Sequence, residues 1–322
     1  MNYMSIEGLF ALILAAGALA VLGRFAYQHF YGSTPLSPVH TGKKHDHSCK
    51  YDQAEQRRAE PRSTPRIDTS NLPPADPKVT ALLSMISTAS LETHVREITG
   101  DSNFLLAGKS TKITGRNSYF KDLEVAMSYL EQYYASLGIK TTRHPYKVRG
   151  RQFYNLIAEL PGSVSPEKVF IVGGHLDSTA GNPWRTEEVA PGADDDGSGT
   201  AGLMELAKVL VGVKHDYTIR IVHFTCEEQG LYGSYAYSDF CATQKTDIVA
   251  MIEMDMIGYC AKPGNRVDIH DDVDRNGSHK LVEIMTRGAK QYGLSLNVVD
   301  THNHAVENRS DHAGFLDHGW MA

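Results

Sequence analysis

The sequence is poor in cysteine and has no excess of positive charge. Its four cysteines, Cys49, Cys226, Cys241 and Cys260, form no CxxC pair, which argues against a disulfide framework or a thiolate zinc site and leaves a single bridge open. The 38 acidic residues outnumber the 32 basic ones. Without a basic stripe, a nucleic-acid partner is not expected. The 322 residues are enough for one large α/β domain or two small ones.

The N-terminus holds one uncharged apolar run, residues 8–23 (GLFALILAAGALAVLG). The run is slightly short for a membrane span, although aromatic residues follow it at 27, 30 and 31. We interpret residues 1–31 as a membrane anchor or a signal sequence. An uncleaved transmembrane helix is favoured over a signal peptide cleaved near residues 18–20, because no Lys or Arg precedes the run. A buried soluble helix is the third interpretation.

The charges flanking this run bear on which side of the membrane the chain lies. Arg24, Lys43 and Lys44 follow the run and Glu7 precedes it, so the positive-inside rule alone would keep the remainder in the cytoplasm. That argument rests on few charges. We expect a membrane-anchored or exported protein with its globular domain outside the cytoplasm.

Residues 32–78 are polar and contain several prolines, which predicts a disordered linker. His40, His45, His47 and Cys49 lie within it. These side chains could bind a metal ion, but a solvated linker that contains histidines is the favoured interpretation.

The remaining residues, 79–322, alternate between strand and helix patterns. Continuous apolar runs such as KVFIVGG are typical of strands buried on both faces. Alternating strands and helices predict an α/β fold with a mainly parallel central sheet and helices on both faces. Strands are expected at 155–160, 168–174, 218–225 and 248–254, and helices near 79–95, 121–137, 200–211 and 278–292.

Acidic residues and one histidine lie where these predicted strands end or where the next helix begins. They are His175, Asp177, the triplet Asp194, Asp195 and Asp196, the pair Glu227 and Glu228, and Asp255. Strand ends are often polar, and Asp is a common helix N-cap. However, ligands bind at the carboxyl edge of such sheets, and several coincidences at one edge favour a functional site.

The composition of this group suits a metal-dependent hydrolase. Carboxylates with a histidine are ligands for zinc or a similar divalent ion. Two such ions can share a bridging carboxylate and activate a water, while an unligated carboxylate accepts the proton. The adjacent Glu227 and Glu228 offer one carboxylate for each role. Asp177 could orient the imidazole of His175 or of a neighbour.

Four segments, GGHLDS, PGADDDGSG, CEEQG and EMDMIGY, resemble the metal-site motifs of the M28 zinc peptidases of the bacterial leucyl aminopeptidase type. The resemblance covers residues 79–322. It implies an aminopeptidase that hydrolyses N-terminal residues from peptides through a zinc-bound hydroxide, with two zinc ions in the complete family site. By motif, it implies His175 as a metal ligand, Asp177 as its supporting acid, Asp195 as the bridging carboxylate, Glu227 as the general base, and Glu228 and Asp255 as ligands of separate ions.

The segment RSDHAGFLDHGWMA resembles the family segment that leads into a late strand and a His-Thr-x-x-Asp loop bearing the last histidine ligand. The sequence contains neither, so we expect an incomplete shell beside Glu228, with one zinc ion as the alternative to two, and an exposed sheet edge. The chain looks like a truncated gene product or a partial sequence. His312 and His318 come too early in this register to be assigned to metal.

Three other interpretations are weighed. Asp194, Asp196, Ser198 and Glu205 match part of the EF-hand spacing, but a helix is already expected from residue 200 and no second hand is present. The domain could instead be a pseudopeptidase that binds one metal ion or none. A one-zinc transferase similar to glutaminyl cyclases shares the fold. Carboxypeptidase specificity and side-chain preference are left open.

Overall fold

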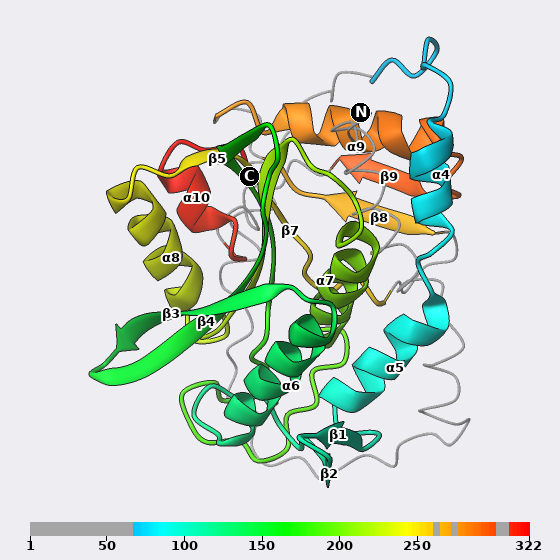
Figure 1. Ribbon diagram of the computed structural model, residues 1–322. Coiled ribbons are helices and arrows are strands. Elements are labelled where there is room, and N and C mark those ends of the chain that lie inside the picture. Colours follow the sequence, from blue (N-terminus) through cyan, green and yellow to red (C-terminus); the bar gives the residue numbers. More distant parts are fainter. Residues whose placement is uncertain (1–66, 260–264, 272–275, 301–308) are drawn as a thin grey trace, which may run out of the picture.

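A five-stranded sheet forms the centre of the computed structural model, which describes residues 67–259, 265–271, 276–300 and 309–322 (Figure 1). The strands lie in the order β3-β4-β6-β5-β7. Their bounds are β3 Lys140–Val148, β4 Arg151–Leu160, β5 Ser165–His175, β6 Tyr217–Phe224 and β7 Asp247–Glu253.

The α/β class is confirmed, but the expectation of a mainly parallel sheet is wrong. Strand β5 pairs in parallel with β6 and β7, whereas β3–β4 and β4–β6 are antiparallel. The reason lies in a two-residue turn, Arg149-Gly150, where both residues have positive φ. This conformation is that of a tight hairpin, which joins β3 and β4 as neighbours of opposite direction.

Alternate residues of the central strands face two different hydrophobic cores. On β5, Phe170 and Val172 belong to one core, and Val169 and Ile171 belong to the other. Successive side chains of a strand point to opposite faces, so burial on both faces requires the continuous apolar run seen in the sequence. The strands predicted at 168–174, 218–225 and 248–254 correspond to β5, β6 and β7.

Helices cover both faces of the sheet. The first core contains residues of α5, α6 and α7, and the second contains residues of α8 and α10 (Figure 1). The predicted helices at 121–137 and 200–211 are α6 and α7, whereas α8 was not predicted. The bounds are α5 Thr88–Ile98, α6 Asp122–Ser136, α7 Gly197–Leu210, α8 Tyr232–Thr243 and α10 Ala313–Asp317.

Smaller elements flank this core. Strands β8 and β9 form a separate parallel pair, and β1 and β2 form an antiparallel pair. The predicted helix at 278–292 is α9, and the predicted first helix is divided into α4 and α5. The bounds are α4 Pro77–Leu83, β1 Phe104–Leu106, β2 Lys109–Thr111, β8 Arg266–Ile269, α9 His279–Gln291 and β9 Asn297–Asp300.

The start of α7 lies directly against the chain that leaves β7. A Cβ atom added to Gly199 would come 2.0 Å from the carbonyl oxygen of Met254 and 2.5 Å from the carboxylate of Asp196. Only glycine allows such an approach. This contact brings the loop before α7 close to the segment that carries Asp255.

The prediction of a transmembrane helix is corrected. In the described part of the chain, no helix combines the length and apolar character that crossing a membrane requires. Residues 8–23, on which that prediction rested, lie outside the described residues, as do His40, His45, His47 and Cys49. The proposed division at residues 31 and 78 and the cellular location stay predictions. Cys226 and Cys241 are buried free thiols.

Candidate metal centre

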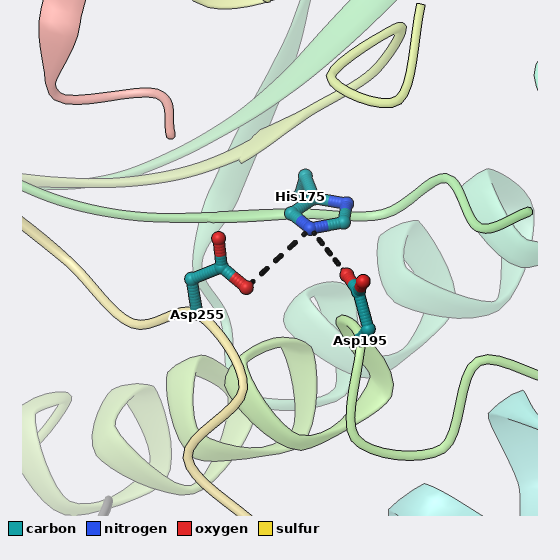
Figure 2. A group of neighbouring side chains, drawn as sticks. All are labelled: His175, Asp195 and Asp255. Atoms are coloured by element: carbon teal, nitrogen blue, oxygen red, sulfur yellow. Dashed lines mark ion pairs between the residues drawn. The ribbon is translucent and has the colours of Figure 1, made fainter. Parts of the chain in front are cut away.

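His175, Asp195 and Asp255 converge at the carboxyl ends of β5 and β7 (Figure 2). The imidazole lies between the two carboxylates. Its Nε2 atom is 3.0 Å from Oδ1 of Asp195 and 3.7 Å from Oδ1 of Asp255. One donor atom from each residue lies within 4.8 Å of the others. Three residues distant in sequence therefore present a compact set of nitrogen and oxygen donors.

The orientation of the His175 ring is fixed by a hydrogen bond at Nδ1, the ring nitrogen that does not face the two carboxylates. Its Nδ1 atom is 3.0 Å from the carbonyl oxygen of Asp177. Because a carbonyl oxygen can only accept, Nδ1 carries the proton in this contact. Nε2 is consequently the atom left for the carboxylates, or for a metal ion in their place. The backbone N–H of His175 also donates to Oδ2 of Asp196, at 3.0 Å.

The pKa values around His175 reflect concentrated negative charge. Burial alone lowers the pKa of His175, but the interactions with the carboxylates of Asp195 and Asp255 raise it well above its ordinary value. Burial raises the pKa of Asp255, yet the interaction with His175 leaves it below the usual value. The group of carboxylates therefore favours a positive charge at this place.

The three aspartates of the triplet have separate roles. Asp196 is the N-cap of α7, and its Oδ1 accepts from the backbone N–H of Gly199 at 2.8 Å. Oδ1 of Asp194 accepts from the N–H of Gly258 at 2.8 Å. Only Asp195 directs its carboxylate to Nε2 of His175. The outer two aspartates therefore hold the loop that presents the middle one.

Glu227 and Glu228 lie in the loop after β6. Burial is the main factor that raises the pKa of Glu227 to about 9 and that of Glu228 to about 7, and neighbouring carboxylates add to it. For Glu228 the largest charge contribution comes from Asp195. Its carboxylate does not belong to the three-residue donor group. Glu228 is therefore close enough to Asp195 for their charges to interact, but it does not complete the first set of donors.

Asp177 supports the site in a different way from the one first expected. Its carboxylate accepts from the hydroxyl of Ser118 at 3.0 Å and from the N–H of Glu227 at 3.2 Å. Its Oδ1 is 3.9 Å from Nδ1 of His175, beyond hydrogen-bond range. The imidazole is instead held by the Asp177 carbonyl oxygen, and the carboxylate ties the Glu227 loop to the chain after β5.

Sequence reasoning missed several side chains around this group. The hydroxyl of Ser310 donates to Oδ2 of Asp255 at 2.8 Å. Asp311 is fully buried, and burial raises its pKa to about 7. Burial also raises the pKa of Glu253, which faces Gly173 on the adjacent strand. An acid inside the apolar run IVAMIEM was the available signal for Glu253.

The contacts of Glu205 and His318 bear on two interpretations, the EF-hand and the exclusion of His318 from the metal ligands. Oε1 of Glu205 accepts from the N–H of Ser87 at 2.8 Å and from Lys208 at 2.6 Å. These bonds occupy Glu205 within the helical layer and argue against an EF-hand. Nε2 of His318 is 2.8 Å from Oδ1 of Asp239 on α8, in agreement with its exclusion from the metal ligands.

A second group of possible ligands occurs elsewhere in the described residues. Nδ1 of His279 is 3.0 Å from Oδ2 of Asp271 and 3.5 Å from Oδ2 of Asp300. These contacts join the start of α9 to the ends of β8 and β9. They are ion pairs when His279 is protonated.

The chain has relatives of known family. Residues 155–322, more than half of the chain, match the model of peptidase family M28. A probable zinc metalloprotease of Pyrenophora tritici-repentis is 36% identical over 116 residues, which is 36% of this chain and 27% of that protein. A probable aminopeptidase of Saccharomyces cerevisiae is 35% identical over 116 residues, 34% of this chain and 31% of that protein. The matches therefore span about a third or less of these relatives.

Solved structures share the fold. The LapA aminopeptidase of Legionella pneumophila superposes with a TM-score of 0.58 at 20% identity, covering 84% of this chain and 66% of that one. A glutaminyl cyclase from an Acidobacteriales bacterium gives 0.54 at 19% identity, covering 80% and 82%. On the match of residues 155–322 to the family model, the chain belongs to peptidase family M28.

Proposed function

We propose that this protein is a zinc-dependent aminopeptidase that removes N-terminal residues from peptides. The observation that carries the proposal is the convergence of His175, Asp195 and Asp255, with one donor atom of each within 4.8 Å of the others. Family membership and relatives named as a zinc metalloprotease and an aminopeptidase support it.

The donor set fits zinc. One imidazole nitrogen and two carboxylates match the nitrogen and oxygen ligands of catalytic zinc sites, which leave a position open. Oδ1 of Asp255 is buried and has no hydrogen-bond donor within the described residues. A buried carboxylate oxygen is costly to leave without a partner. We assign His175, Asp195 and Asp255 to one ion, and Glu228 with Asp195 to a second.

Bound zinc would polarise the scissile carbonyl and lower the pKa of an attacking water. Glu227 takes the proton from this water and returns it to the leaving amine. Burial raises the pKa of Glu227 to about 9. A nearby positive charge lowers a carboxyl pKa, so a bound cation would favour the carboxylate form that accepts a proton. Asp177 holds the Glu227 backbone in place for this transfer.

The test is the substitution Glu227→Gln, assayed with aminoacyl p-nitroanilides and with zinc analysis of the same samples. Loss of a general base typically costs about 10²–10⁴-fold in rate, and we expect that loss in kcat while the zinc content stays at the wild-type value. Glu188→Gln, which changes an exposed glutamate of the 179–190 loop, is the matched control. Turnover retained in Glu227→Gln would refute the assignment of Glu227 as the general base.

A glutaminyl-cyclase-like activity is the second candidate. It is favoured by one observation, that the convergent donors His175, Asp195 and Asp255 form a single set suited to one ion. Release of ammonia from a peptide with N-terminal glutamine distinguishes the two activities. A wild-type protein that binds zinc but catalyses neither reaction would instead be a non-catalytic binding domain.

A further inference from the structure

Arg116 is one of the largest fully buried side chains of the protein. It precedes α6 and lies beneath the loops that carry the candidate ligands. Within the described residues, its guanidinium donates to backbone carbonyl oxygens alone. Nε binds Leu176 at 2.8 Å, Nη1 binds Pro191 at 2.6 Å and Ile98 at 3.2 Å, and Nη2 binds Gly192 at 2.8 Å.

Three of these four acceptors come from the two ligand-bearing segments, and the fourth, Ile98, is the last residue of α5. Leu176 lies between His175 and Asp177, directly after β5. Pro191 and Gly192 begin the loop that leads to Asp195. A single rigid group therefore bridges the two pieces of chain whose side chains meet at Nε2 of His175. The distance between these segments is consequently set by the planar guanidinium and its fixed donor directions.

The loop that begins at Pro191 is shaped around the guanidinium of Arg116. Gly192 has a φ of +48°, and a Cβ atom added there would come 2.2 Å from the carbonyl oxygen of Asp195 and 3.1 Å from Nη2 of Arg116. The backbone thus folds back on itself where it contacts the guanidinium. A side chain at position 192 would separate the loop from Arg116.

The acidic surroundings explain why the positive charge of Arg116 is buried at this place. Among the described residues, no carboxylate forms a salt bridge with Arg116, and burying a cation without one is costly. Burial lowers the pKa of Arg116 to about 10, and the charges of Asp196, Asp177, Asp195 and Glu228 oppose that effect. Arg116 therefore remains a cation at neutral pH and offsets the repulsion within the acidic group.

We propose that Arg116 is a positioning residue of the metal centre, whose guanidinium sets the spacing of His175 and Asp195 through the carbonyl oxygens of Leu176, Pro191 and Gly192. This inference rests on the proposed function only in that the site must bind zinc. Two effects of Arg116 on zinc oppose each other. Its charge repels a cation, whereas the fork formed by its fixed, diverging N–H donors organises the ligands. The geometry assigns the larger effect to the fork, because all four hydrogen bonds hold backbone and none holds a carboxylate.

The two effects are separable by substitution. Arg116→Lys keeps the charge and loses the fork, and Arg116→Gln loses both. The measurement is the zinc dissociation constant of the metal-free protein, obtained by competition with a chromogenic chelator. Removing a group that orients metal ligands typically weakens binding about 10–100-fold, and we expect that loss in Arg116→Lys and in Arg116→Gln.

Arg143→Lys is the matched control. Arg143 makes three hydrogen bonds of 2.7–2.8 Å to Glu131 and Glu124, between β3 and α6, and its loss should leave zinc affinity unchanged. Circular dichroism shows whether each variant is folded. If Arg116→Lys does not fold, Gly192→Ala tests the same contact from the loop, with the same expected loss of affinity.

The outcomes separate the two proposals. If the wild type binds zinc no better than His175→Ala, the metal centre itself is refuted. If the wild type binds zinc and folded Arg116→Lys binds it equally well, the positioning role alone is refuted. Tighter binding by Arg116→Gln with unchanged binding by Arg116→Lys would show that charge, not the fork, is the effect of Arg116.

Discussion

Asp196 offers a test of how the fold and the site depend on each other. Its fully buried carboxylate accepts hydrogen bonds from the N–H of Gly199 in the first turn of α7, from the N–H of His175, and, at 3.4 Å, from the N–H of Met256. Replacing an aspartate N-cap by alanine costs about 0.5–2 kcal/mol. Leaving a buried N–H without an acceptor costs about 1–3 kcal/mol more.

The substitution Asp196→Ala should therefore lower the free energy of unfolding by roughly 1.5–5 kcal/mol. For a domain of this size each kcal/mol corresponds to about 2–4 °C in Tm. We therefore expect a decrease of about 3–20 °C in the metal-free protein, measured by circular dichroism or calorimetry.

The control is Asp76→Ala. Asp76 is the N-cap of α4 and accepts one hydrogen bond, from Lys78 at 2.8 Å, so only the capping contribution is lost. The difference between the two variants reports the bonds of Asp196 outside α7, to His175 and Met256. A decrease in Tm for Asp196→Ala no larger than that for Asp76→Ala would refute the reasoning.

Two further predictions follow from buried hydrogen bonds and from burial of a histidine. Ser310→Ala removes the 2.8 Å bond to Asp255 and should weaken zinc binding about 10-fold or more, whereas an unchanged dissociation constant would show that Asp255 needs no such support. Burial lowers the pKa of His94 from 6.5 to about 4. As the pH falls, the unfolded chain therefore takes up a proton at His94 before the folded protein does. The stability contributed by neutral His94 is consequently lost as the pH falls from 6.5 toward 4. Between pH 7 and pH 5 this amounts to about 2 kcal/mol, so urea titrations should show a shallower loss of stability in His94→Gln, and equal losses would contradict the assignment.

The parts of the fold that were predictable are those with a strong local signal. Strands β5, β6 and β7 are buried on both faces, so their apolar runs were visible in the sequence. Strand β3 was missed because it lies at the edge of the described sheet and alternates exposed and buried residues in KTTRHPYKV. The direction of a strand leaves no such trace, and the turn at Arg149-Gly150 accounts for the antiparallel pairing of β3 with β4 alone.

The candidate site was predictable to a similar extent. Strand ends pointed to His175, Asp195 and Asp255, which the structure brings together. The residues that hold them come from distant parts of the chain, with Arg116 60 residues before its contact Leu176 and Ser310 55 residues after Asp255. Arginine before a helix and serine in a loop are ordinary in sequence, so only their hydrogen bonds show what they do.

The close approach at Gly199 has a consequence for redesign of this protein. The contact of α7 with the chain leaving β7 is between main-chain atoms, so the backbone segments that carry Asp195 and Asp255 cannot move closer together there. An attempt to accommodate a different ion would therefore have to change the ligand side chains or their rotamers, because the backbone is already in contact at that point.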